Sequence, residues 1–128
     1  PQISPQDMPV LAEEGFVRVL CNRPDMEVPP SHQAAAMEVA AQEAGIEFFV
    51  MPLTHQSMTP EIIAQNKAII DGCDGKVLAY CASGTRTTIA WALGYATEMD
   101  ADEIIAAARA GGYELEGLRP TLQASAKR

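Results

Sequence analysis

The residues with the clearest chemical potential are a cysteine and an arginine, Cys81 and Arg86, which enclose four small residues. The enclosed residues are Ala82, Ser83, Gly84 and Thr85. A cysteine thiolate is a nucleophile, and the backbone N–H groups at a helix N-terminus attract negative charge. An arginine adds a planar pair of donors that suits a tetrahedral anion. The pattern therefore predicts that Cys81 is a nucleophile and that Arg86 and the enclosed N–H groups bind an anionic substrate.

Two other loops carry titratable residues, at Arg23, Asp25 and His55. Arg23 would add positive charge near the anion, Asp25 would serve as a general acid, and His55 would be an acid or a cation at the rim. The alternatives are a loop ion pair or turn for the first two residues and a solvent-exposed histidine for the third. These alternatives stay open on the sequence alone.

The other two cysteines and the second histidine are weaker candidates for functional residues. Cys21 ends a predicted strand, so it is either a packing residue or a resolving thiol near Cys81. Cys73 is expected to be inert and His32 to be structural or solvated. Since no group of histidines, cysteines or carboxylates has metal-ligand spacing, the sequence predicts no metal and no other cofactor.

Alternating helices and strands must bring these loops together. Apolar and β-branched runs predict strands at 16–21, 46–51 and 77–80. Prolines, glycines and capping residues predict helices at about 5–14, 32–44 and 60–72, and a fourth helix that begins near residue 85. Ser31 is the predicted cap of the second helix. A capping box at Asp100 predicts a fifth helix, which ends near residue 110. The short connections predict an α/β fold with a mainly parallel sheet flanked by helices.

In such a sheet the loops at the carboxyl ends of the strands share one edge, where ligands bind. The sequence places three loops there, at 22–30, 52–58 and 81–86. We therefore expect one site built from all three loops.

Composition excludes several classes of function. The chain has 128 residues, enough for a single domain over residues 1–128. Its net charge of −8 disfavours a nucleic-acid partner, and no apolar run approaches the length of a membrane span. Three cysteines, an odd number, and no signal-peptide pattern favour a reduced, cytoplasmic protein.

Several stretches resemble one bacterial family, the beta-lactamase-hydrolase-like, phosphatase-like domain. They are NRPD at 22–25, IEFFVMP at 46–52, VLAYCASGTRT at 77–87, QISPQD at 2–7 and AGGY at 110–113. The Cys-x4-Arg loop also resembles those of rhodanese sulfurtransferases and cysteine-dependent phosphatases. The resemblance implies a three-layer, cysteine-phosphatase-like architecture. Family members usually begin with one more short strand, which implies that this chain lacks a native N-terminal strand. Some are fused to a sulfur dioxygenase, which suggests such an enzyme as a fused or separate partner.

The resemblance also indicates which reaction the loop could catalyse. Tyrosine and dual-specificity phosphatases have five residues between cysteine and arginine, whereas this chain has four. Dual-specificity phosphatases carry an acidic aspartate on the preceding loop, and residues 52–56 contain no carboxylate. Both differences favour transfer of sulfane sulfur from a small anionic donor through a Cys81 persulfide. Ala82 is a departure, because the family often has arginine there and one positive group is missing.

Two alternatives remain. The first is a phosphatase that hydrolyses phosphomonoesters through a phosphocysteine, with His55 or Asp25 as the acid. The second is a non-catalytic domain that binds an anion or a protein partner, which Ala82 and the missing aspartate would support.

Overall fold

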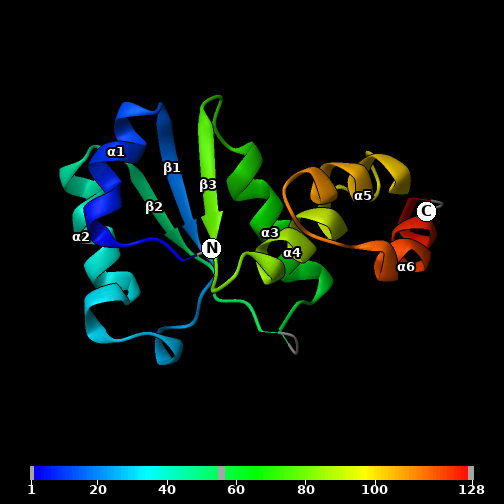
Figure 1. The fold of residues 1–128 in the computed structure, drawn as a ribbon, viewed down its shortest axis with the longest axis horizontal. Coiled ribbons are helices and arrows are strands. Elements are labelled where there is room, and N and C mark those ends of the chain that lie inside the picture. Colours follow the sequence, from blue (N-terminus) through cyan, green and yellow to red (C-terminus); the bar gives the residue numbers. More distant parts are fainter. Residues whose placement is uncertain (1, 55–56, 127–128) are drawn as a thin grey trace.

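The structure, a computed structural model, describes residues 2–54 and 57–126. Its centre is a three-stranded parallel sheet in the order β2-β1-β3 (Figure 1). The strands are β1 (Phe16–Cys21), β2 (Glu47–Val50) and β3 (Lys76–Tyr80). Because β1 pairs in parallel with both neighbours, all three strands end at the same edge. This arrangement confirms the predicted α/β fold and the shared edge for the loops.

Helices cover both faces of the sheet and give the molecule three layers (Figure 1). The helices are α1 (Met8–Glu13), α2 (Ala34–Glu43), α3 (Pro60–Asp71), α4 (Thr85–Tyr95), α5 (Ala101–Ala110) and α6 (Arg119–Ala126). Helices α1 and α2 pack on one face, and α3 and α4 lie together on the other. Helices α5 and α6 extend the second layer beyond α4. Within the part of the chain that is described, no helix is long and apolar enough to cross a membrane.

Two cores hold these layers. Alternate residues of the strands face α1 and α2, so Val19, Cys21 and Tyr80 pack with Met8 and Met37. The second core joins α4, α5 and α6 through small alanines and buried Ile104, Ile105 and Leu122. The loop at residues 81–86, between β3 and α4, is therefore anchored at both ends in packed structure.

Most element boundaries follow the local sequence signals. Strand β1 has the predicted bounds, and α3 begins after Thr59, whose hydroxyl accepts a hydrogen bond from the Ile62 N–H. Helix α5 begins at Ala101 with Asp100 as its N-cap, as the sequence predicts, but the Asp100 side chain makes no capping hydrogen bond.

The predicted Ser31 cap is wrong. A 3-10 turn at Pro30–His32 precedes α2, and the Ser31 hydroxyl contacts the His32 ring. Helix α2 begins at Ala34, whose N–H donates at 2.8 Å to Asp25 Oδ1. A carboxylate from the preceding loop therefore caps the helix in place of the local hydroxyl.

Candidate active site

Cys81 directly follows β3, and α4 begins four residues later, at Thr85. The turn between them depends on Gly84, the N-cap of α4, whose φ of 94° lies in the left-handed region. A side chain at this position would be strained, so glycine is required here. The short connection leaves the thiol in front of the first turn of the helix.

The anion loop, residues 81–86, has three successive carbonyl groups bound by donors from outside it. Ala82 O accepts from Gln2 N at 2.8 Å, Ser83 O from the Tyr113 hydroxyl at 2.7 Å, and Gly84 O from the Thr88 hydroxyl at 2.7 Å. In a trans peptide the C=O and the following N–H point in opposite directions. The outward Ser83 carbonyl therefore directs the Gly84 N–H inward, toward the thiol, whereas the Thr85 N–H donates to the Ser83 hydroxyl at 3.4 Å.

Cys81 is buried, with 1% of its surface exposed. Burial acts to raise the pKa of its thiol, but hydrogen bonds from the Thr87 hydroxyl and from loop N–H groups outweigh it. The N–H donors belong to Thr87, Gly84 and Arg86, and the resulting pKa is lowered. The loop thus favours the thiolate that a nucleophile requires.

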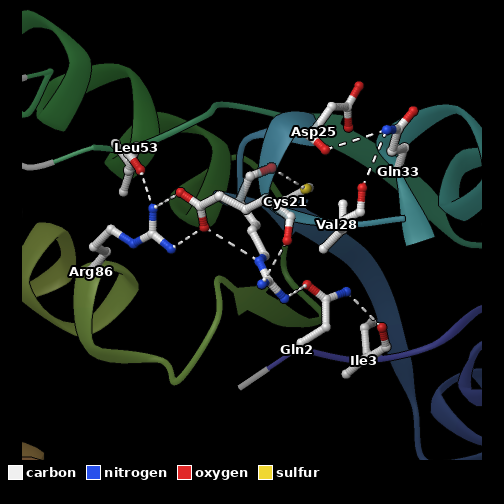
Figure 2. A network of polar contacts seen from close by, with 10 residues as sticks. Gln2, Ile3, Cys21, Asp25, Val28, Gln33, Leu53 and Arg86 are labelled. Carbon is white, nitrogen blue, oxygen red and sulfur yellow. Dashed lines mark hydrogen bonds and ion pairs between the residues drawn. The ribbon is translucent and has the colours of Figure 1, made fainter. Parts of the chain in front are cut away.

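Arg86 is held by a bidentate ion pair with Glu27, at 2.8 Å from Nη1 and 2.6 Å from Nη2. Nη1 also donates to the Leu53 carbonyl at 2.9 Å (Figure 2). A guanidinium has five N–H donors, and these contacts engage three of them. Glu27 has the largest effect in raising the pKa of Arg86, and the negative charge and the hydrogen-bonding sulfur of Cys81 add smaller effects. Partners on two other loops therefore hold the Arg86 guanidinium in place, close enough to Cys81 for each to affect the other's charge.

Glu27 is a carboxylate that the sequence prediction missed. The hydrogen bond from Arg86 lowers the pKa of Glu27, with a smaller contribution from Arg23. The group is therefore ionised at neutral pH and is unsuited to donate a proton to a leaving group.

Arg23 lies beside this ion pair. Its Nη1 donates to Gln2 Oε1 at 3.0 Å, and its Nη2 donates to the Glu27 carbonyl at 3.1 Å. The loop ion pair that was one alternative for Arg23 is thus present, between its Nε and Glu27 at 3.4 Å. A role for Arg23 in substrate binding stays a prediction, as it does for residues 82–85.

Of the two predicted acids, Asp25 and His55, the structure describes only Asp25. Asp25 caps α2 through Ala34, and in Figure 2 it lies on the other side of the network from Arg86. Its position is explained by that cap, and its role as a general acid stays a prediction. His55 lies outside the described residues.

Asn22 is a second residue whose role the sequence did not predict. It is fully buried, and its Oδ1 accepts from the Thr87 hydroxyl at 2.9 Å. Its Nδ2 donates to Met51 O at 2.9 Å and to Asn66 Oδ1 at 2.8 Å. The polar position after β1 was the available signal, but its partners lie on other elements and no local pattern reveals them.

Cys21 shares the carboxyl edge of the sheet but differs from Cys81. Burial raises the pKa of the Cys21 thiol, and the sulfur donates to the Arg23 carbonyl at 3.5 Å. The resolving-thiol hypothesis for Cys21 stays a prediction, and its raised pKa disfavours a thiolate. Among the residues described, no group of three or more histidines, cysteines and carboxylates is arranged to hold a metal ion.

Comparison with known proteins shows which proteins this chain resembles. The family model described as "Beta-lactamase hydrolase-like protein, phosphatase-like domain" matches residues 1–98. A beta-lactamase hydrolase-like protein of Xylella fastidiosa strain Temecula1 is 32% identical over 106 residues, which are 81% of this chain and 25% of that protein. The chain thus spans about a quarter of the length of the curated relatives it matches.

Solved structures share the fold. A candidate phosphatase from Neisseria meningitidis matches with a TM-score of 0.84 and 31% identity, covering 98% of this chain and 89% of that one. Pseudomonas aeruginosa TpbA matches with a TM-score of 0.63 and 15% identity, covering 98% and 74%. At that identity the second likeness concerns the fold alone.

Proposed function

The chain belongs to the beta-lactamase hydrolase-like protein, phosphatase-like domain family, and on that premise we propose that it is a sulfurtransferase with Cys81 as its nucleophile. The observation that carries the proposal is the position of the Cys81 thiol at the N-terminus of α4, where the Gly84, Arg86 and Thr87 N–H groups act to lower its pKa, on a loop whose Arg86 is held by Glu27. Arg86 and the loop bind an anionic sulfane sulfur donor, for which thiosulfate is the simplest probe.

The reaction has two balanced steps. The Cys81 thiolate attacks the outer sulfur of thiosulfate, so that a new S–S bond forms, the old S–S bond breaks, and sulfite leaves with the electron pair. The product is a Cys81 persulfide anion. A nucleophile such as cyanide then attacks the terminal sulfur, forms thiocyanate and releases the thiolate.

Among the described residues, the contacts of the two carboxylates on the β1–α2 loop support sulfur rather than phosphoryl transfer. Sulfite is a good leaving group and needs no proton, whereas an alkoxide does. Of the two carboxylates on the β1–α2 loop, Glu27 is held ionised by Arg86 and Asp25 caps α2. The four-residue spacing between Cys81 and Arg86 favours the same chemistry.

The test is thiosulfate:cyanide sulfur transfer, measured as thiocyanate, with detection of the Cys81 persulfide by mass spectrometry. Wild type should form thiocyanate and Cys81→Ser should form none. Cys21→Ser is a matched control, since it alters another buried cysteine at the same edge, and it should retain activity. Absence of Cys81-dependent thiocyanate, together with turnover of a phosphomonoester, would overturn the proposal.

A phosphatase is the second candidate, favoured by the family description and by the Neisseria structure. In that reaction the thiolate attacks phosphorus, the alkoxide leaves with a proton from His55 or Asp25, and water hydrolyses the phosphocysteine. This candidate predicts hydrolysis of p-nitrophenyl phosphate that vanadate inhibits and that Cys81→Ser abolishes.

A non-catalytic domain is the third candidate. It predicts an ordinary thiol pKa, which alkylation of Cys81 by iodoacetamide across pH would detect. A sulfur dioxygenase as a fused or separate partner, and a cytoplasmic location, stay predictions. A copurification experiment with the full-length protein would test the first.

A further inference from the structure

Tyr113 reaches the anion loop from a distant part of the chain. It follows α5, and its ring packs against the core between α4, α5 and α6. Its hydroxyl donates to the Ser83 carbonyl at 2.7 Å, across 30 positions in sequence. Among the described residues, no second group donates a hydrogen bond to the Ser83 carbonyl. The C-terminal layer therefore makes a direct contact with the loop that holds the nucleophile.

The contact acts on the peptide unit between Ser83 and Gly84. The Ser83 carbonyl and the Gly84 N–H belong to the same planar group and point in opposite directions. With the carbonyl bound by Tyr113, the Gly84 N–H faces the Cys81 sulfur, where it is one of the donors that favour the thiolate.

A restraint is needed here because Gly84 is conformationally permissive. Its φ of 94° shows that the backbone already uses the region open to glycine. A peptide before glycine can rotate with little steric resistance, and rotation would turn the Ser83 carbonyl toward the thiolate. An oxygen lone pair in that place would repel both the thiolate and an incoming anion.

We propose that Tyr113 is a positioning residue of the anion loop: its hydroxyl holds the Ser83 carbonyl outward and so keeps the Gly84 N–H directed at Cys81. The inference rests on the proposed function in taking Cys81 as the nucleophile. It does not depend on whether sulfur or phosphorus is attacked.

Tyr113→Phe tests this role because it removes the hydroxyl and retains the ring. Two alkylating agents separate the effects: neutral iodoacetamide reports the thiolate fraction, and iodoacetate also reports attraction of an anion. At pH 7 the variant should react with iodoacetamide about threefold to tenfold more slowly, in keeping with one weakened hydrogen bond to an ionised group. The ratio of iodoacetate to iodoacetamide reactivity should fall as well, and the alkylation curve should move to higher pH.

Tyr95→Phe is the matched control, since the Tyr95 hydroxyl also donates a hydrogen bond, but to the Asp71 carboxylate and away from the loop. It should leave both alkylation rates unchanged. Tyr113→Leu, which also lacks the hydroxyl, replaces Tyr113→Phe if circular dichroism shows that the phenylalanine variant is unfolded.

Two outcomes separate this inference from the proposed function. A folded Tyr113 variant with the wild-type alkylation curve and reactivity ratio would overturn the role of Tyr113. Wild-type protein that forms no thiocyanate, while Tyr113→Phe still shifts the alkylation curve, would overturn sulfur transfer and leave the role of Tyr113 supported.

Discussion

The reactivity of a single thiol depends on a balance between burial and hydrogen bonds. Burial opposes ionisation of Cys81, and Thr87 is the strongest of the donors that reverse it. The same hydroxyl donates to Asn22 Oδ1 at 2.9 Å, so the amide oxygen and the sulfur are alternative acceptors for its one proton. The side chain of Thr87 therefore tunes the nucleophile without being part of the Cys-x4-Arg pattern.

Thr87→Val should raise the pKa of the Cys81 thiol, because it removes the hydroxyl donor and keeps the branched shape. Since the thiolate is the reactive form, alkylation near pH 7 should slow by about tenfold, as expected for the loss of a hydrogen bond to a charged group. At a pH above the pKa of Cys81 in both proteins, both thiols are ionised and the variant should no longer react more slowly. Thr87→Ser, which retains a hydroxyl, is the control. A valine variant with an unchanged pH profile would contradict this assignment.

Arg86 acts through its planar fork as well as its charge. Two guanidinium nitrogens are committed to Glu27, and this fixes the direction of the remaining donors. Arg86→Lys retains the charge but cannot reproduce that geometry. Its kcat/KM for thiosulfate should fall about tenfold to hundredfold, the effect of one or two charge-assisted hydrogen bonds. Arg109→Lys alters an exposed arginine paired with Glu114 and should have no effect. Equal losses in both variants would argue against a special role for Arg86.

At the level of elements, the structure agrees with the sequence wherever the signal was local. Strand β1 and the Thr59 cap of α3 were predictable because their determinants lie within the element itself. The start of α2 was not, because its cap comes from Asp25, nine residues before Ala34. For the same reason the partners Glu27 of Arg86 and Asn22 of Thr87 were missed, since 59 and 65 positions separate them.

The cap on α2 gives a means to separate structure from catalysis at Asp25. Asn retains a capping oxygen but cannot act as an acid, whereas Ala has neither a capping oxygen nor an acidic group. Asp25→Ala should lower the free energy of unfolding by about 0.5–2 kcal/mol, and Asp25→Asn should lower it by much less. Urea denaturation measures both values. Sulfur transfer should be unchanged in Asp25→Asn, whereas a marked loss of phosphomonoester hydrolysis in this variant would identify Asp25 as the acid of the alternative reaction.

For the whole molecule, the anion site depends on contacts that join all three loops at the carboxyl edge of the sheet. The backbone of Asn22 bonds to Tyr80 and Leu53, each at 2.8 Å, so it connects β1 to β3 and to the loop after β2. Its side chain adds Asn66 of α3 and Thr87 of α4. One buried residue thus joins the layers at the point where the nucleophile lies.

Asn22→Ala should therefore affect both stability and reactivity. It leaves several buried polar groups without their partner, so the free energy of unfolding should fall by about 2–4 kcal/mol. Gln65→Ala, at an exposed amide one residue from Asn66, should change it by less than about 0.5 kcal/mol. Urea denaturation measures the free energy of unfolding of both variants.

Alkylation by iodoacetamide across pH measures the reactivity of Cys81 in the folded Asn22→Ala variant. Because Thr87 loses its competing acceptor, its hydroxyl can donate fully to the Cys81 thiolate, and the alkylation curve should move to lower pH. A shift to higher pH would instead mean that Asn22 holds Thr87 in place for Cys81.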